Sequence, residues 1–256
     1  MTLTLSNGPL GTSPHPTVNY SIDGPAHRLL LDPFPRRVRG LLGGETVVDT
    51  RRAQLLHESN ILPRLYVPWE DVREELVEAS DHTTHCPFKG DASYWHMRVG
   101  DRLAENAIWS YPAPVEAAPW LDGLAAFYLE RLDEWLDEDE SVGVHMRDPY
   151  HRVDVRRSSL PVKVTAGGEV VAESSRPMLL SETGVPNRLY LPREDIRMDV
   201  LAASETRAYC PYKGDSSFFH VAGIEDAAWT YDDPLDNALK TAGHIAFDDS
   251  KVKLSA

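Results

Sequence analysis

The sequence is poor in cysteine, in positive charge and in long apolar runs. Only two cysteines occur among 256 residues. A small secreted disulfide scaffold would need more, so we expect a reduced protein of the cytoplasm. Lysine and arginine total 26 against 40 acidic residues, a formal net charge of −14 that repels phosphate backbones and argues against a nucleic-acid partner. No apolar run approaches the ~20 residues that cross a bilayer, and the N-terminus lacks the basic start and apolar stretch of a secretory signal, so we expect no membrane partner.

What the sequence does contain is an internal repeat. CPFKGDAS at 86–93 recurs 124 positions later as CPYKGDSS at 210–217, and RLYVPWEDV at 64–72 recurs at the same offset as RLYLPREDI. Near the end of each copy the offset is 120, where AIWSYPAP at 107–114 pairs with AAWTYDDP at 227–234. Because order, spacing and residue type agree over most of each copy, the chain is predicted to hold two tandem repeats. We place the boundaries at 1–27 (extended N-terminal arm), 28–140 (first repeat), 141–151 (linker) and 152–256 (second repeat).

Local patterns within one repeat predict mostly strands. The glycine pairs at 43–44 and 167–168 lie between β-prone runs and predict tight hairpins. The alternation at 64–67 predicts that Arg64 and Tyr66 share one strand face, while Leu65 and Val67 take the other. The segments 69–80 and 193–204 begin with acids and continue with an apolar stripe, which predicts one short amphipathic helix in each repeat. The expected fold is mainly β (α+β), with two small antiparallel domains related by a pseudo-two-fold axis.

One joint pattern resembles a known family. The string TxCPxKGxAxY follows RLYVPxxDV and precedes AxWxYP, and together these resemble the family called domain of unknown function 427, over both repeats and so nearly the whole chain. The resemblance implies a compact β-tent-like fold related to methionine sulfoxide reductase B. Several proteins of that fold bind zinc through two CxxC pairs, whereas this sequence has no CxxC, so we expect neither metal nor cofactor. The family sometimes carries a nucleotidyltransferase label, although no glycine-rich phosphate loop or paired metal-binding carboxylates occur in this chain.

Reactive side chains kept in both copies gather at the CPxKG turn. A thiol becomes nucleophilic beside a cation, and a lysine beside a sheet pocket can act as a base, form a Schiff base or bind an anion. The alternatives are a small buried cysteine that ends a strand and a solvated lysine in a turn whose glycine supplies positive φ. The aspartate after the glycine would brace the turn or pair with the lysine. The candidate catalytic residues are Cys86, Lys89, Asp91, Cys210, Lys213 and Asp215.

A second group of paired residues would bind substrate. If the arginine and the phenol lie on an inward strand face, they would bind a carboxylate or carbonyl of the substrate. If they lie on an outward face, the two side chains would stack on each other. The tryptophans would form pocket wall or core, and the strand histidines either bind substrate or serve the sheet. The candidate substrate-binding residues are Arg64, Tyr66, His96, Trp109, Arg188, Tyr190, Trp229 and His220. His82, His85, Cys86 and His96 resemble a zinc cluster, but Thr206 and Tyr209 replace His82 and His85 in the second copy, so we expect no metal site.

These patterns favour an enzyme of small-molecule metabolism, with a pocket beside the CPxKG turn and the RLY strand. The alternatives are a non-catalytic ligand-binding or protein-interaction module and a nucleotide-processing enzyme. The expected partner is a small-molecule ligand, and the chain is expected to be a monomer with an internal pseudo-dimer or a weak homodimer. The position of the two lysines separates the first two hypotheses, because lysines exposed to bulk solvent would favour the module.

Overall fold

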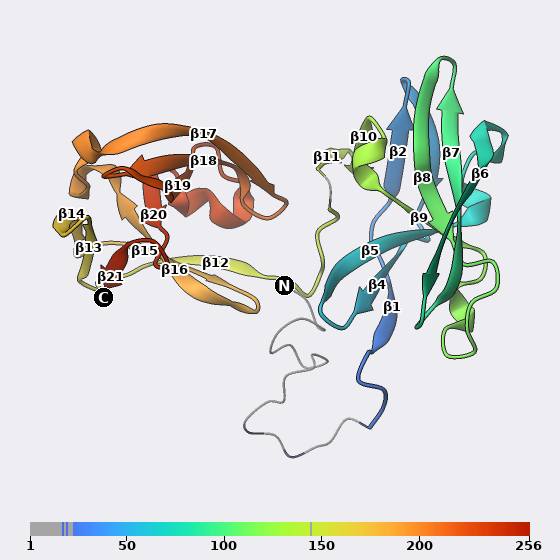
Figure 1. The fold of residues 1–256 in the computed structure, drawn as a ribbon, viewed down its shortest axis with the longest axis horizontal. Helices are drawn as coiled ribbons and strands as arrows, with labels where there is room; N and C mark the ends of the chain where they lie inside the picture. The colour runs from blue at the N-terminus through green and yellow to red at the C-terminus, as the bar shows by residue number, and fades with distance from the viewer. Residues whose placement is uncertain (1–16, 18, 20–22, 144) are drawn as a thin grey trace. The chain divides into compact units, whose positions relative to one another are not determined.

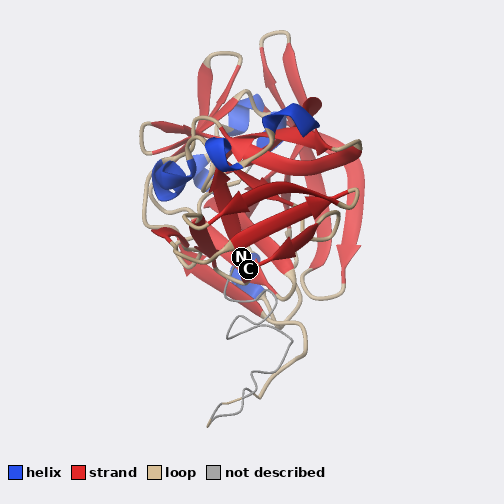
Figure 2. Ribbon diagram, turned by 90° about the vertical axis from the view of Figure 1, so that its left-hand side faces the viewer, coloured by secondary structure: helices blue, strands red, loops and turns tan. Residues whose placement is uncertain are grey.

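The computed structural model describes residues 17, 19, 23–143 and 145–256, so most of the proposed arm at 1–27 lies outside the described residues. Internal contacts divide the chain into a first unit, Met1–Tyr150, and a second unit, His151–Ala256. Both units consist of antiparallel strands joined by turns and short 3-10 segments (Figures 1 and 2). The expected mainly-β fold with two similar domains is confirmed. In the described part of the chain, no helix has the length and apolar character needed to cross a membrane.

The first unit contains one large and one small antiparallel sheet. Its seven-stranded sheet follows the order β1 (Leu29–Pro33), β4 (Gln54–Glu58), β5 (Ile61–Pro68), β9 (Leu124–Phe127), β8 (Arg102–Ser110), β7 (Gly90–Val99) and β6 (Val77–Cys86). Its four-stranded sheet follows the order β11 (Glu140–Val142), β10 (Glu134–Asp137), β2 (Val38–Leu42) and β3 (Glu45–Thr50). The Gly43-Gly44 hairpin between β2 and β3 is confirmed, with both glycines at positive φ.

The second unit repeats the large sheet, and its small sheet has three strands in place of four. Its seven-stranded sheet follows the order β12 (Val153–Arg157), β15 (Met178–Glu182), β16 (Val185–Pro192), β20 (His244–Phe247), β19 (Ile224–Tyr231), β18 (Gly214–Val221) and β17 (Leu201–Cys210). The small sheet holds β14 (Glu169–Ser174), β13 (Val162–Ala166) and β21 (Lys253–Ser255). The Gly167-Gly168 hairpin joins β13 to β14, as predicted.

The large sheet of the first unit has a different apolar cluster on each face. Leu65 and Val67 belong to the main core, together with Val38 and Leu42 of the small sheet. Tyr66, between them on the same strand, belongs to a second cluster with Trp109. The predicted alternation along this strand is therefore confirmed, and the face opposite the small sheet is an aromatic one.

The predicted amphipathic helices are wrong. Residues Trp69–Asp71 and Glu74–Leu76 form two 3-10 turns, and β6 begins at Val77. In the second unit, turns at Arg193–Asp195 and Met198–Val200 likewise precede β17. Val72 forms a β-bridge with Val48, and Arg73 N donates to Val47 O at 3.0 Å. The backbone is therefore bonded to β3, and tertiary pairing overrides the helical periodicity.

Candidate functional site

A buried ion pair lies beside the aromatic face of the first unit. Lys89 Nζ donates to Glu58 Oε1 at 2.5 Å, and the two side chains are only 11% and 4% exposed. His27 Nε2 lies 3.3 Å from the other oxygen of the same carboxylate, Oε2. The three residues are spaced 31 positions apart along the chain. We name His27, Glu58 and Lys89, with their second-unit equivalents, the carboxylate cluster.

Strand pairing and a tight turn bring the three side chains together. Glu58 ends β4, where it pairs with Leu29 of β1. The residue after His27 is fixed to the same place, because Arg28 N donates to Ser59 Oγ at 2.9 Å and Ser59 N donates to Arg28 O at 3.0 Å. Lys89 comes from the turn between β6 and β7. The cluster is thus built from three segments distant in sequence, two from one end of the sheet's strand order and the lysine turn from the other.

Gly90 allows the lysine turn to pack closely. Its φ is +108°, and a Cβ there would lie 3.1 Å from the carbonyl oxygen of Ala113. Val115 N donates to Lys89 O at 3.1 Å, which holds the turn against the loop that follows β8. Gly214 has the same role, with φ +96° and a Cβ position 3.1 Å from Asp233 O. Both glycines are backbone requirements of the turn, as the sequence analysis allowed.

The second unit builds the same cluster. Lys213 Nζ donates to Glu182 Oε2 at 2.5 Å, and both side chains are 13% exposed. His151 Nε2 lies 3.0 Å from Glu182 Oε1. Burial alone would raise the pKa of Glu182, but the hydrogen bonds and charges of His151 and Lys213 outweigh it and lower the pKa to about 2. The carboxylate is therefore ionised throughout the physiological pH range.

Aromatic rings form the floor beside each cluster. In the first unit, Lys89 Nζ lies 5.6 Å from the ring centroid of Tyr111, and Tyr66 meets Trp109 edge to face at 6.4 Å. In the second unit, Trp229 Nε1 donates to Tyr190 OH at 3.1 Å. Burial raises the pKa of Tyr66 and Tyr190, so these phenols stay neutral. The aromatic floor consists of Tyr66, Trp109 and Tyr111 in the first unit and of Tyr190, Trp229 and Tyr231 in the second.

One further ring covers each histidine. Phe88, which is 42% exposed, stacks on His27 with ring centroids 3.9 Å apart and an interplanar angle of 12°. Tyr212 is its equivalent and lies 4.1 Å from His151. In both units an aromatic residue of the CPxKG turn therefore contacts the histidine of the carboxylate cluster.

With this geometry established, comparison with known families is decisive. A single family model matches residues 30–138 and again residues 154–256, and its description is domain of unknown function (DUF427). The chain belongs to the DUF427 family. The two matches confirm the resemblance and the tandem repeat. No curated protein was found to match the chain.

The structure of this DUF427 chain brings only some of the predicted site residues together. Lys89, Tyr66 and Trp109 gather at the cluster and its floor, and Cys86 packs against the same aromatic cluster. Asp91 does not pair with the lysine; it binds His85 Nδ1 at 2.6 Å on the exposed surface. Asp215 is likewise exposed. The charge partner of each lysine is thus a glutamate on another strand, and the proposed pairing of lysine with aspartate is wrong.

The remaining candidates lie elsewhere on the sheets. His96 Nδ1 accepts a hydrogen bond from Asn106 N at 2.9 Å, and His220 Nδ1 accepts one from Asp226 N at 3.1 Å. Asn106 and Asp226 have positive φ, so these histidines brace strained backbone. Arg188 Nη1 donates to Asp249 Oδ1 at 2.7 Å. Arg64 lies on the same strand as Tyr66, and its charge acts on Tyr128. That charge lowers the pKa of Tyr128, but burial has the larger effect and raises this pKa overall.

Sequence reasoning missed the acidic and imidazole members of both clusters. Glu58 and Glu182 were available as a matched pair in LLHES and LLSET, at the offset of 124. The same offset relates His27 to His151, each followed by arginine. Both histidines lie in the segments interpreted as the arm and the linker, outside the predicted repeats.

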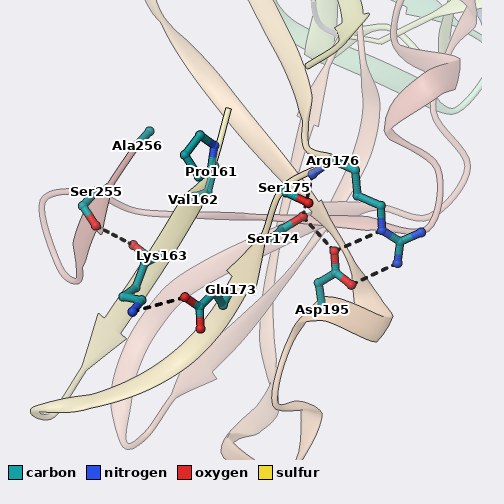
Figure 3. A pocket seen from close by; sticks show the side chains of 10 residues that line it. All are labelled: Pro161, Val162, Lys163, Glu173, Ser174, Ser175, Arg176, Asp195, Ser255 and Ala256. Atoms are coloured by element: carbon teal, nitrogen blue, oxygen red, sulfur yellow. Dashed lines mark hydrogen bonds and ion pairs between the residues drawn. The ribbon is translucent and has the colours of Figure 1, made fainter. Parts of the chain in front are cut away.

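A separate hollow in the second unit involves none of these residues. Its volume is about 650 Å³, and it is lined by β13, β14 and the last residues of the chain (Figure 3). Its polar groups bind one another: Lys163 pairs with Glu173, and Arg176 and Ser174 both bind Asp195 (Figure 3). Among the described residues, no group of three or more metal-ligating side chains gathers in one place.

Proposed function

We propose that each unit of this DUF427 protein is an acid–base site acting on a small polar molecule, so that the chain is an enzyme of small-molecule metabolism. Glu58 and Glu182 accept a proton from the substrate. Lys89 and Lys213 stabilise the negative charge that forms when the substrate keeps the electron pair. His27 and His151, next to the carboxylates, orient them and can pass the proton on.

The ion pair decides which residue is the base. Lys89 Nζ donates to the carboxylate of Glu58 at 2.5 Å, and an amine that serves as a donor to a carboxylate is not available to attack a carbonyl or to accept a proton. Of the two members of the ion pair, the carboxylate is the one that can accept a proton. The proposal therefore assigns the base to glutamate and charge stabilisation to lysine, in place of the lysine base that the CPxKG turn suggested.

The observation that carries the proposal is the same buried cluster in two diverged units. A buried ion pair costs desolvation, and well-packed apolar residues in its place are often as stable or more stable. Stability alone therefore gives little reason for two units to keep lysine, glutamate and histidine in one geometry. Buried ionisable groups that have a specific charge partner are candidates for functional sites.

A non-catalytic ligand-binding module is the second candidate. Its support is that lysine and histidine already bind both carboxylates, which leaves the carboxylates poorly placed to take a proton from a substrate. In that case the cluster would bind a ligand without changing it.

One experiment separates the two functions. The full chain is incubated with a defined metabolite mixture, and consumption and products are followed by mass spectrometry. The double variant E58Q/E182Q should lower conversion roughly a hundredfold or more, because the base is lost. K163M removes a lysine from an exposed ion pair outside the clusters and should leave conversion unchanged. Conversion that survives in E58Q/E182Q refutes the acid–base role, and binding without conversion by the wild type selects the module.

A further inference from the structure

The small sheet of the second unit has an edge that the first unit covers. In the first unit, β11 pairs with β10, and β10 pairs with β2. In the second unit, β21 pairs with β13, and no strand among the described residues pairs with its other edge. Trp135 of β10 pairs with Gly40, and Leu254 of β21 pairs with Val164. Since the repeat offset of 124 relates positions 40 and 164, β21 is the equivalent of β10, and its outer edge corresponds to the edge that β11 covers.

The hollow of about 650 Å³ lies at this open edge (Figure 3). Ser255 of β21 lines it, and so does Lys163 of β13. The equivalent of Lys163 is Arg39, which binds the turn between β10 and β11, because its Nη2 donates to Glu138 O at 2.7 Å. Arg37 N donates to Glu138 Oε1 of the same turn at 2.9 Å. The first unit thus fills the equivalent of this hollow with its own chain. We name the outer edge of β21 and this hollow the strand seat.

The strand seat differs from its counterpart in charge. Three arginines of the first unit hold the acidic hairpin of β10 and β11: Arg36, Arg37 and Arg51. Their equivalents in the second unit are uncharged: Leu160, Pro161 and Ser175. Pro161 has no N–H to donate, and Leu160 is 44% exposed. Lys163 keeps its charge but already pairs with Glu173. The strand seat therefore offers an apolar side chain where the first unit offers cations.

One apolar side chain of β21 is incompletely covered. In the first unit, Trp135 is 1% exposed, and Val142 of β11 packs against the same core. In the second unit, the equivalent Leu254 packs against the core but stays partly exposed. β21 is short and carries Lys253, and such features keep many sheet edges from pairing. A partly covered leucine next to a hollow nevertheless leaves apolar surface that an added strand would remove from water.

We propose that the strand seat binds an extended segment of a partner protein, which adds antiparallel to β21 and carries apolar residues at its first and third positions. The register follows β11, whose residues pair with those of β10: Glu140 with Asp137, Ser141 with Leu136 and Val142 with Trp135. The third residue of the partner takes the place of Val142, beside Leu254. The first takes the place of Glu140, which lies near Arg36 in the first unit, and Leu160 replaces that arginine. Backbone hydrogen bonds at the sheet edge give such a segment affinity, and the two side-chain positions give it specificity. No residue of the carboxylate clusters takes part, so this inference goes beyond the proposed function.

Two peptides test the strand seat in the full chain. Acetyl-SESVGS-amide contains the sequence of residues 140–143, and acetyl-SVSVGS-amide replaces its glutamate by valine. Binding is followed through assigned backbone amides in ¹H–¹⁵N correlation spectra. Both peptides should shift the amides of Lys163, Leu254 and Ser255. The valine peptide should bind about fivefold more tightly, because its valine is buried beside Leu160, whereas the glutamate would lose water without gaining a cation.

Restoring the arginine tests the cause of this preference. L160R should reverse it, because Ala256 stands where the first unit has Asp137, so the new guanidinium is left for the glutamate of the peptide. V170S is the matched control, since Val170 on β14 is 41% exposed and should leave both affinities unchanged. Absence of shifts at β21, equal affinities, or a preference that L160R does not move would overturn the inference. Shifts of the same amides with protein concentration alone would also overturn it, because a second copy of the chain would then occupy the strand seat.

Discussion

Removing the ammonium of Lys89 should destabilise the first unit far more than breaking a surface ion pair. In K89M the carboxylate of Glu58 keeps its buried position, 4% exposed, but loses its charged partner. Truncating one member of a buried pair costs about 3–5 kcal/mol. The matched control is R98M. Arg98 and Glu78 are 42% and 45% exposed, so its cost should stay below about 1 kcal/mol.

A second variant separates lost charge balance from lost packing. E58L/K89M removes both charges and supplies apolar volume, so it should recover most of the stability lost in K89M. The first unit should nevertheless be inactive, because its base is gone. If E58L/K89M were as unstable as K89M, the cost would come from packing and not from an uncompensated carboxylate.

Urea unfolding of the full chain, followed by tryptophan fluorescence, measures these effects. Five of the six tryptophans lie in the first unit, and a W229F background removes the signal of the second. The free energy of unfolding is then that of the first unit. A loss in K89M no larger than that in R98M would refute the reasoning, because it would mean that the pair is effectively solvated.

Three further outcomes follow from the structure. The carboxyl ¹³C shift of Glu182 should titrate with a midpoint near the pKa of about 2, and a midpoint above 4 would contradict the cluster. The ionised form of Glu182 then contributes about 3 kcal/mol to the free energy of unfolding at neutral pH. This contribution is lost as the pH falls from 4.5 towards 2. G90A should lower the free energy of unfolding, measured by thermal unfolding, by about 1–3 kcal/mol. The loss should exceed that of G44A, because a Cβ at position 44 has no neighbouring atom within 4 Å. Equal losses would mean that the backbone at Ala113 O shifts to accommodate the new Cβ. His57 is fully buried, neither ring nitrogen has a hydrogen-bond partner among the described residues, and burial lowers its pKa, so wild-type stability should fall as the pH drops below 6.5. H57L should be at least as stable as the wild type and lose less between about pH 8 and about pH 5, which Tm measurements check.

The sequence predicted the strand faces better than it predicted the turns. Alternation placed Tyr66 opposite Leu65 and Val67 correctly, because side chains of any strand alternate whatever it pairs with. The helix predicted at 69–80 failed, because its periodicity ignored the bridge between Val72 and Val48. That bridge depends on a strand more than twenty residues earlier, which no local window includes.

The sequence by itself determined the duplication, the DUF427 family, the mainly-β class and the lysine turn with its glycine, because each is encoded in contiguous residues or in a fixed offset. Only the tertiary structure decided what the lysine does. Its partner is Glu58 and not the nearby Asp91, although β5, β9 and β8 separate β4 from β7 in the sheet order, so the contact depends on how the whole domain folds. Burial between aromatic rings then turns an ordinary lysine and glutamate into a desolvated pair, and burial is a property of the folded chain as a whole.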